Sequence, residues 1–167
     1  YDIDRDSYEP VRILDEDSPP RYLHYGEDFV DYKFPAGTRV LYPNLPMKPI
    51  ENRRAAIRYA INHPEGDVDP LFAQLVPGMR VTIAIDDISV PLPVMKQPDI
   101  RQQILEILIE MLEDHGVEDY EMVIALALHR RMSEAEIKRM VGPEIFAEYY
   151  PHRLYNMDAE DPDGMVV

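Results

Sequence analysis

The feature that most constrains the fold of this chain is a pair of short apolar segments that end abruptly in polar residues. The first, at 80–86, is rich in β-branched residues and runs into Asp86 and Asp87. The second, at 120–128, runs into His129. Continuously apolar runs of this length are typical of buried parallel strands. We therefore expect two buried strands, each followed directly by chemically reactive side chains.

The sequence between and after these segments predicts helices. Apolar residues recur at helical spacing over 100–115, where Asp99 can cap the start and Gly116 can close the end. Ser133-Glu134-Ala135-Glu136 is a capping box that opens a second helix, ending near Val141. The resulting strand–helix–strand–helix order predicts an α/β fold with a Rossmann-like parallel sheet flanked by helices.

The remainder of the chain predicts smaller elements. Residues 1–24 are acidic and interrupted by proline, which indicates an extended acidic arm before an α/β domain at 25–167. Segments 28–33 and 38–42 have the pattern of short strands, and we expect them to pair as a small β-hairpin. Helices are expected over 50–62 and 70–75, and a last helical segment over 144–150 precedes a short strand at 153–155.

Composition excludes several classes of function. The formal net charge of −15 should repel nucleic acid phosphates and anionic membranes, so neither is an expected partner. No apolar run approaches the roughly 18 residues of a membrane span. The chain lacks cysteine, which removes disulfides and thiolate chemistry and is consistent with a cytoplasmic location. The apolar ending Gly164-Met165-Val166-Val167 resembles the start of a strand, and suggests part of a longer or multi-chain protein.

The two strand ends form the candidate site. Ligands of open α/β sheets lie beyond the carboxyl ends of the strands. Asp86, Asp87 and Ser89 follow the first strand, and His129 begins the segment after the second. Because parallel neighbours end at the same edge, an acid and a histidine are expected to share one cleft. His129 is either a general base or ligand, or a histidine with a purely structural hydrogen bond. The two aspartates either bind a ribose or cation, act in acid–base chemistry, or cap a turn to Ser89.

Arg130 and Arg131 also have two interpretations. They are placed to hold a phosphate or carboxylate. They are also close enough in sequence to pair with Glu134 or Glu136, which is the commoner role. No H-x-x-x-H or carboxylate–histidine spacing of a metal site occurs, so no metal ligand is assigned in this chain.

At these residues the chain resembles the N-terminal part of the nickel-dependent lactate racemase family. Asp87-Ile88-Ser89-Val90-Pro91-Leu92-Pro93 is similar to the family's Asp-x-x-Arg-Pro-Thr-Pro segment. Ala127-Leu128-His129-Arg130-Arg131-Met132-Ser133 is similar to its Gly-Thr-His-Arg-Pro-Met segment. Further matches are Tyr25-Gly26, Phe34-Pro35-Ala36-Gly37, Pro77-Gly78 and Asn156-Met157-Asp158-Ala159. The resemblance covers most of residues 25–167.

The resemblance implies an isomerase that racemises or epimerises a 2-hydroxy acid by hydride transfer to a nickel pincer nucleotide bound through a lysine. His129 would be one of two proton-transfer histidines, and Asp87 would line the cofactor and substrate cleft. The other histidine, the lysine and the nickel-binding histidine of the family lie further along its sequence. A C-terminal domain or companion chain would therefore complete the site.

Three departures from the family pattern change this expectation. Val90 stands where the family has an arginine, so either Arg130 or Arg131 compensates, or the substrate differs from lactate, or the activity is lost. Leu128 replaces a small turn residue, and Met157 replaces a histidine. The alternative function is a non-catalytic module that keeps the fold and binds a nucleotide or a partner protein.

Overall fold

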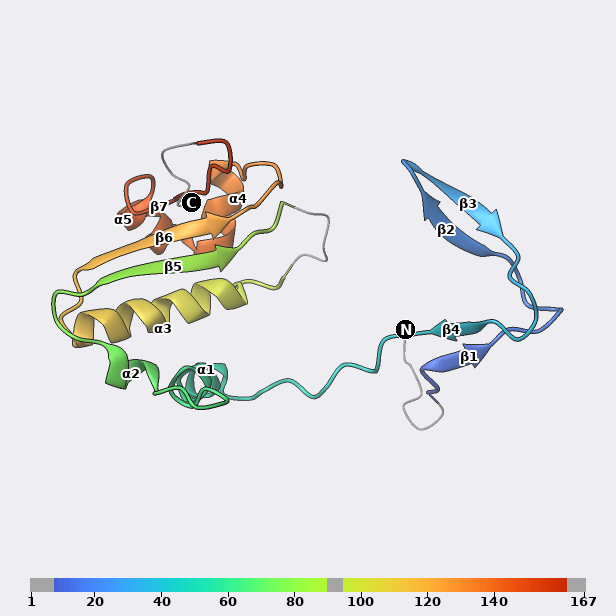
Figure 1. Cartoon of the computed structure of the whole chain (residues 1–167), viewed down its shortest axis with the longest axis horizontal. Coiled ribbons are helices and arrows are strands. Elements are labelled where there is room, and N and C mark those ends of the chain that lie inside the picture. Colours follow the sequence, from blue (N-terminus) through green and yellow to red (C-terminus); the bar gives the residue numbers. More distant parts are fainter. Residues whose placement is uncertain (1–7, 90–94, 162–167) are drawn as a thin grey trace. The chain divides into compact units, whose positions relative to one another are not determined.

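A computed structural model describes residues 8–89 and 95–161 of the chain, which divides into two compact units, Tyr1–Pro49 and Ile50–Val167. The first unit consists of two antiparallel pairs of strands (Figure 1). β2 (Arg21–Tyr25) pairs with β3 (Asp28–Tyr32), and β1 (Val11–Ile13) pairs with β4 (Arg39–Leu41). Of the described residues of this unit, only Leu14 is buried.

The predicted pairing of 28–33 with 38–42 is wrong, because each of these segments has another partner. Gly26 has φ of +63° and lies in the tight turn that joins β2 directly to β3. The β1–β4 pairing continues through hydrogen bonds from the Gly37 amide to the Leu14 carbonyl (2.7 Å) and from the Leu14 amide to the Thr38 carbonyl (2.9 Å). The predicted acidic arm thus contains two strands that pair with residues outside it.

The second unit is a parallel sheet flanked by helices. Its strands are β5 (Arg80–Asp86), β6 (Asp119–Ala125) and β7 (Leu154–Asn156), and β6 lies between the other two. The helices are α1 (Arg53–Asn62), α2 (Leu71–Gln74), α3 (Ile100–Asp114), α4 (Glu134–Val141) and α5 (Pro143–Tyr149). The predicted parallel strand–helix–strand arrangement is confirmed, and the third strand joins it at β7.

One hydrophobic core holds this unit together. Alternate residues of the strands, such as Ile85, Met122 and Leu154, are buried in the same cluster as apolar side chains of α3, α4 and α5. Ile107 of α3 and Met140 of α4 are fully buried in it. The intervening positions of β5 are exposed, so the core fixes which side chains face the helices. No helix in the described part of the chain is long and apolar enough to cross a membrane.

The second predicted strand is shorter than expected. β6 ends at Ala125, which is the register partner of Asp86 at the end of β5. Beyond this point Ala127 adopts φ of +49°, and the His129 amide donates to the Leu126 carbonyl (2.8 Å), so the chain turns. Leu128 is 94% exposed on this turn. The predicted strand is too long because the prediction rests on apolar composition. The turn after β6 is defined by backbone conformation, which apolar composition does not reveal.

Candidate functional site

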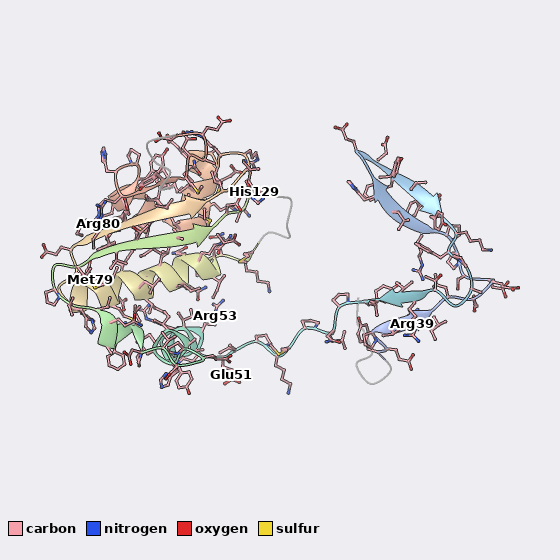
Figure 2. The ribbon with its side chains drawn as sticks, in the orientation of Figure 1. Arg39, Glu51, Arg53, Met79, Arg80 and His129 are labelled. Atoms are coloured by element: carbon pink, nitrogen blue, oxygen red, sulfur yellow. The ribbon has the colours of Figure 1, made fainter. Side chains whose placement is uncertain are left out.

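The segments that follow β5, β6 and β7 place the candidate residues at the carboxyl edge of the sheet. Figure 2 shows His129 at this edge, at the opposite end of the sheet from Met79 and Arg80. Parallel pairing of β5 with β6 is the reason that Asp87 and His129, 42 residues apart, meet here. The sequence-based expectation that an acid and a histidine share this edge agrees with the geometry.

Asp87 and His129 are in direct contact. The Nδ1 atom of His129 lies 3.2 Å from both Oδ1 and Oδ2 of Asp87. Asp87 is 4% exposed, whereas the His129 side chain is 46% exposed. The buried carboxylate therefore holds a histidine whose ring reaches the surface.

The surroundings of Asp87 favour its ionised form. Burial raises the pKa of this carboxyl, but hydrogen bonds from the Ser89 hydroxyl, the Ser89 amide and His129 outweigh it and leave the pKa below its usual value. The amide of Ser89 donates to Oδ2 over 3.1 Å, and its hydroxyl donates to the same oxygen. At neutral pH Asp87 is thus a buried anion with three donors.

This contact also sets the proton position on the imidazole of His129. An ionised carboxylate only accepts hydrogen bonds, so the Nδ1 atom of neutral His129 carries its proton toward Asp87. The Nε2 atom is then an unprotonated acceptor on a side chain that is partly exposed. A histidine in this tautomer, beside a carboxylate, can take a proton from a ligand and be stabilised as imidazolium.

Two further residues fix the backbone around the pair. Arg101 donates from Nη1 to the carbonyls of Asp86 (3.3 Å) and Asp87 (3.1 Å), and its guanidinium is held by Asp99 at the start of α3. Asn156, at the end of β7, bonds to both the amide (3.3 Å) and the carbonyl (2.8 Å) of Met132. The end of β5 is therefore tied to α3, and the end of β7 is tied to the loop that follows β6.

Asp86 does not join this arrangement through its side chain. It lies at an exposed position of β5, and its carbonyl, rather than its carboxylate, is bonded by Arg101. The structure therefore brings Asp87, and not Asp86, to His129. Ser89 lies at the site as a donor to Asp87. Val90 lies outside the described residues.

Arg130 points to the start of α4. Its Nη1 and Nη2 atoms donate to the two carboxylate oxygens of Glu136 over 3.0 and 2.7 Å. Glu136 also accepts from the amide and hydroxyl of Ser133, which completes the predicted capping box. Of the two interpretations of Arg130, the geometry matches pairing with Glu136.

The pKa of Glu136 offers a check on this arrangement. The Arg130 guanidinium and the Ser133 donors lower the pKa of Glu136 from 4.5 to about 2. A depressed pKa means that the capping interaction is fully present above pH 4.5 and is lost as pH falls through about 2. We expect an NMR titration of the Glu136 side-chain carboxyl to have its midpoint near pH 2. Arg130→Gln should move the midpoint of the Glu136 titration toward pH 4.5, whereas the control Arg139→Gln, on the same helix, should not. An unmoved midpoint in Arg130→Gln would contradict the pairing of Arg130 with Glu136.

Arg131 lies on the other side of the turn. Its Nη2 atom pairs with Asp158, which follows β7. Both residues line a pocket of about 240 Å³ beside His129, and the described residues that line it are Ala127, Leu128, His129, Arg131, Met157, Asp158, Ala159 and Glu160. This set is called the His129 pocket below. A base, a cation and a cavity of small-molecule size thus meet at one edge.

Sequence reasoning missed the roles of Arg101, Asn156 and Asp158. Asn156 and Asp158 lie in the segment 156–159, which resembles a family motif. A motif of this kind does not indicate which residues their side chains contact. Arg101 bonds backbone carbonyls 14 and 15 residues away, and such contacts leave no periodic signal in a sequence. Within residues 8–89 and 95–161, no group of three His, Cys, Asp or Glu side chains is placed to hold a metal ion.

A family model and a solved structure match this chain. The family model described as "Lactate racemase N-terminal domain" matches residues 25–167. The structure of the lactate racemase apoprotein from Thermoanaerobacterium thermosaccharolyticum matches with a TM-score of 0.48 and 17% sequence identity. This match covers 84% of the present chain and 30% of that chain, so the present chain spans under a third of its length. A comparison with curated proteins found no match. The match of the family model over most of the sequence shows that the chain belongs to the lactate racemase N-terminal domain family.

Proposed function

We propose that this chain is the N-terminal part of a lactate-racemase-like isomerase that racemises or epimerises a 2-hydroxy acid. The observation that carries the proposal is the contact between buried, ionised Asp87 and the partly exposed His129, which lines a pocket. Membership of the family supports the same class of enzyme. The proposed roles are proton transfer for His129 and orientation of its ring for Asp87.

The chemistry assigned to this chain is the handling of one proton. Inverting the α-carbon of a 2-hydroxy acid through a keto intermediate requires loss of the hydroxyl proton and of a hydride from the α-carbon. The Nε2 atom of His129 takes the hydroxyl proton, and Asp87 stabilises the imidazolium that forms. When the hydride returns to either face of the keto carbon, His129 gives the proton back.

The hydride acceptor belongs to the part of the proposal that rests on the family resemblance. A nickel pincer nucleotide, when bound, would supply that acceptor. Because the described residues contain no cluster of three metal-ligating side chains, no step is assigned to a metal held by them. We propose that a further domain or companion chain carries the cofactor, and that Asp87 and His129 face it from this side.

The substrate proposed is a 2-hydroxy acid other than lactate. Val90 replaces the arginine of the family motif, so one expected cation is absent from the sequence there. Leu128 replaces a small turn residue and contributes an exposed apolar side chain to the lining of the His129 pocket. These two changes suit a substrate with a larger or more apolar group on its α-carbon than a methyl group.

A non-catalytic binding module is the second candidate. Its support is the same replacement of the motif arginine by Val90, because a module that has lost catalysis no longer needs that charge. Such a protein would keep the pocket and the fold, and would bind a nucleotide or partner without turnover.

The experiment that separates the two uses the complete polypeptide purified from its own host. The protein is analysed for nickel and then incubated in D₂O with single enantiomers of a panel of 2-hydroxy acids. We expect loss of optical purity for at least one acid, without deuterium at the α-carbon, because a hydride returns without exchanging with solvent. Nickel-loaded protein that leaves every acid optically pure would overturn the enzyme proposal in favour of the binding module.

A further inference from the structure

The His129 pocket contains a cation that the family pattern does not predict. We propose that Arg131 is the residue that binds the carboxylate of the ligand in this pocket, and that Asp158 holds Arg131 in position. The inference rests on the proposed function in one respect, since the ligand is taken to be a 2-hydroxy acid. It goes beyond that function by naming the group that recognises the acid.

The position of Arg131 in the pocket supports this role. The pocket is lined on one side by the turn that carries His129 and Arg131, and on the other by the segment after β7. A 2-hydroxy acid has its hydroxyl on the carbon next to its carboxylate. A base and a cation that line the same small pocket can therefore engage the two groups of one ligand together.

The guanidinium of Arg131 has donor nitrogens that make no hydrogen bond with the described residues. Among the described residues, its Nη2 atom is the one guanidinium nitrogen with a hydrogen-bond partner, Asp158. The side chain is 64% exposed, compared with 39% for Asp158. The planar fork of an arginine can hold one carboxylate on one edge and a second on another, so a ligand need not displace Asp158.

Arg130 does not offer the same possibility. Both of its terminal nitrogens are bonded to Glu136, and Nη1 also donates to the Arg131 carbonyl over 3.2 Å. It is not among the residues that line the His129 pocket. Arg130 is therefore paired with Glu136 at the start of α4, whereas Arg131 lines the pocket.

Asp158 is suited to hold the guanidinium of Arg131 in a fixed orientation. Besides Arg131, it accepts a hydrogen bond from the Glu160 amide over 3.1 Å, which fixes the carboxylate at the end of the β7 segment. Glu160 also lines the pocket, so Asp158 and Glu160 make the pocket acidic apart from Arg131 and His129. Among the described residues that line the pocket, Arg131 is the one with a permanent positive charge for an anionic ligand.

The sequence motifs also support a carboxylate-binding role for Arg131. Val90 stands at the position of the family's motif arginine, and Arg131 stands where the family's second motif has proline. Compared with the two motifs quoted above, the sequence lacks an arginine at position 90 and has an additional one at position 131.

The test measures binding of glycolate, the smallest 2-hydroxy acid, to the complete polypeptide. Its neutral isostere glycolamide is the control ligand, and the readout is the NMR shift of the His129 ring proton during titration. We expect glycolate to move this signal and glycolamide to leave it unmoved. Arg131→Gln should weaken glycolate binding by about tenfold or more, the loss typical of a charge-assisted bidentate pair.

Three comparison variants make the result specific to Arg131. Arg80→Gln removes the same charge at the opposite end of the sheet and should leave the affinity within about twofold, because exposed charges beyond a Debye length of roughly 10 Å are screened. Asp158→Asn, which releases Arg131, should weaken binding less than Arg131→Gln. Equal affinities of Arg131→Gln and Arg80→Gln would overturn the inference, as would a loss confined to Arg130→Gln. Because Arg131 is exposed, its variant is expected to fold, and an unchanged amide NMR fingerprint verifies this.

The outcome also separates this inference from the proposed function. Arg131-dependent glycolate binding in a protein that epimerises no hydroxy acid would retain the anion site and overturn the enzyme. Conversely, epimerisation with the same KM in wild type and Arg131→Gln would retain the enzyme and overturn the role of Arg131.

Discussion

Replacing His129 by alanine is expected to lower kcat/KM for the epimerised hydroxy acid by about 10²–10⁴, the usual contribution of a positioned general base. The Nε2 atom of this residue is the proposed acceptor of the hydroxyl proton, and water cannot be held by Asp87 in the same orientation. The side chain is 46% exposed, so its removal leaves no cavity in the core and should not unfold the protein. The loss therefore reports on chemistry rather than stability.

The measurement is the initial rate of epimerisation by the complete, cofactor-loaded polypeptide. His152→Ala is the matched control, because it removes an exposed histidine from the segment that precedes β7, at the other end of that strand. Its rate should equal that of the wild type. Full activity of His129→Ala would remove His129 from the mechanism and leave the role of the pocket as binding alone.

The second large effect is expected for Asp87→Asn, which should lower kcat/KM by about 10²-fold through misorientation of His129. In the wild type, Oδ2 of Asp87 accepts from the amide and hydroxyl of Ser89, and both carboxylate oxygens lie 3.2 Å from Nδ1 of His129. In the variant, the Ser89 donors favour the amide oxygen at the Oδ2 position and turn the NH₂ group toward His129. Donation from this NH₂ group to Nδ1 favours the tautomer with its proton on Nε2, which disables the proposed base.

A spectroscopic readout distinguishes this role from a structural one. The ¹⁵N chemical shifts of the His129 ring report which nitrogen carries the proton. We expect the Nδ1-protonated form in the wild type and the Nε2-protonated form in Asp87→Asn, whereas Asp119→Asn, at the start of β6, should behave as the wild type. An Asp87→Asn protein that keeps both the Nδ1-protonated form and the wild-type rate would contradict the orientation argument.

The central architecture could be predicted from the sequence because its signals are local. β5 and α3 match their predicted ranges closely: a short β-branched run bounded by acid specifies a strand, and a capped amphipathic segment specifies a helix. The first unit was predicted less well, because which strand pairs with which depends on turn geometry at Gly26 and Gly37 rather than on composition.

The candidate site was predicted in outline but not in detail. Parallel topology was sufficient to bring a histidine and an aspartate to one edge. Which aspartate turns inward depends on the residue at which β5 ends, and only the structure shows that Asp87 is buried while Asp86 is exposed. Arg130 pairs with Glu136, whereas Arg131 lines the pocket. This difference depends on the direction of each side chain, which a sequence with two adjacent arginines does not reveal.

The two antiparallel strand pairs of the first unit bury very little apolar surface among themselves. Burying one leucine contributes roughly 1.5–3 kcal/mol, whereas fixing the backbone costs about 1–2 kcal/mol for every residue. Leu14 is the single buried side chain of residues 8–49, while aromatic residues such as Tyr22, Tyr25 and Phe29 remain exposed. Burial within residues 8–49 therefore offsets only a small part of the conformational entropy that ordering these four strands costs.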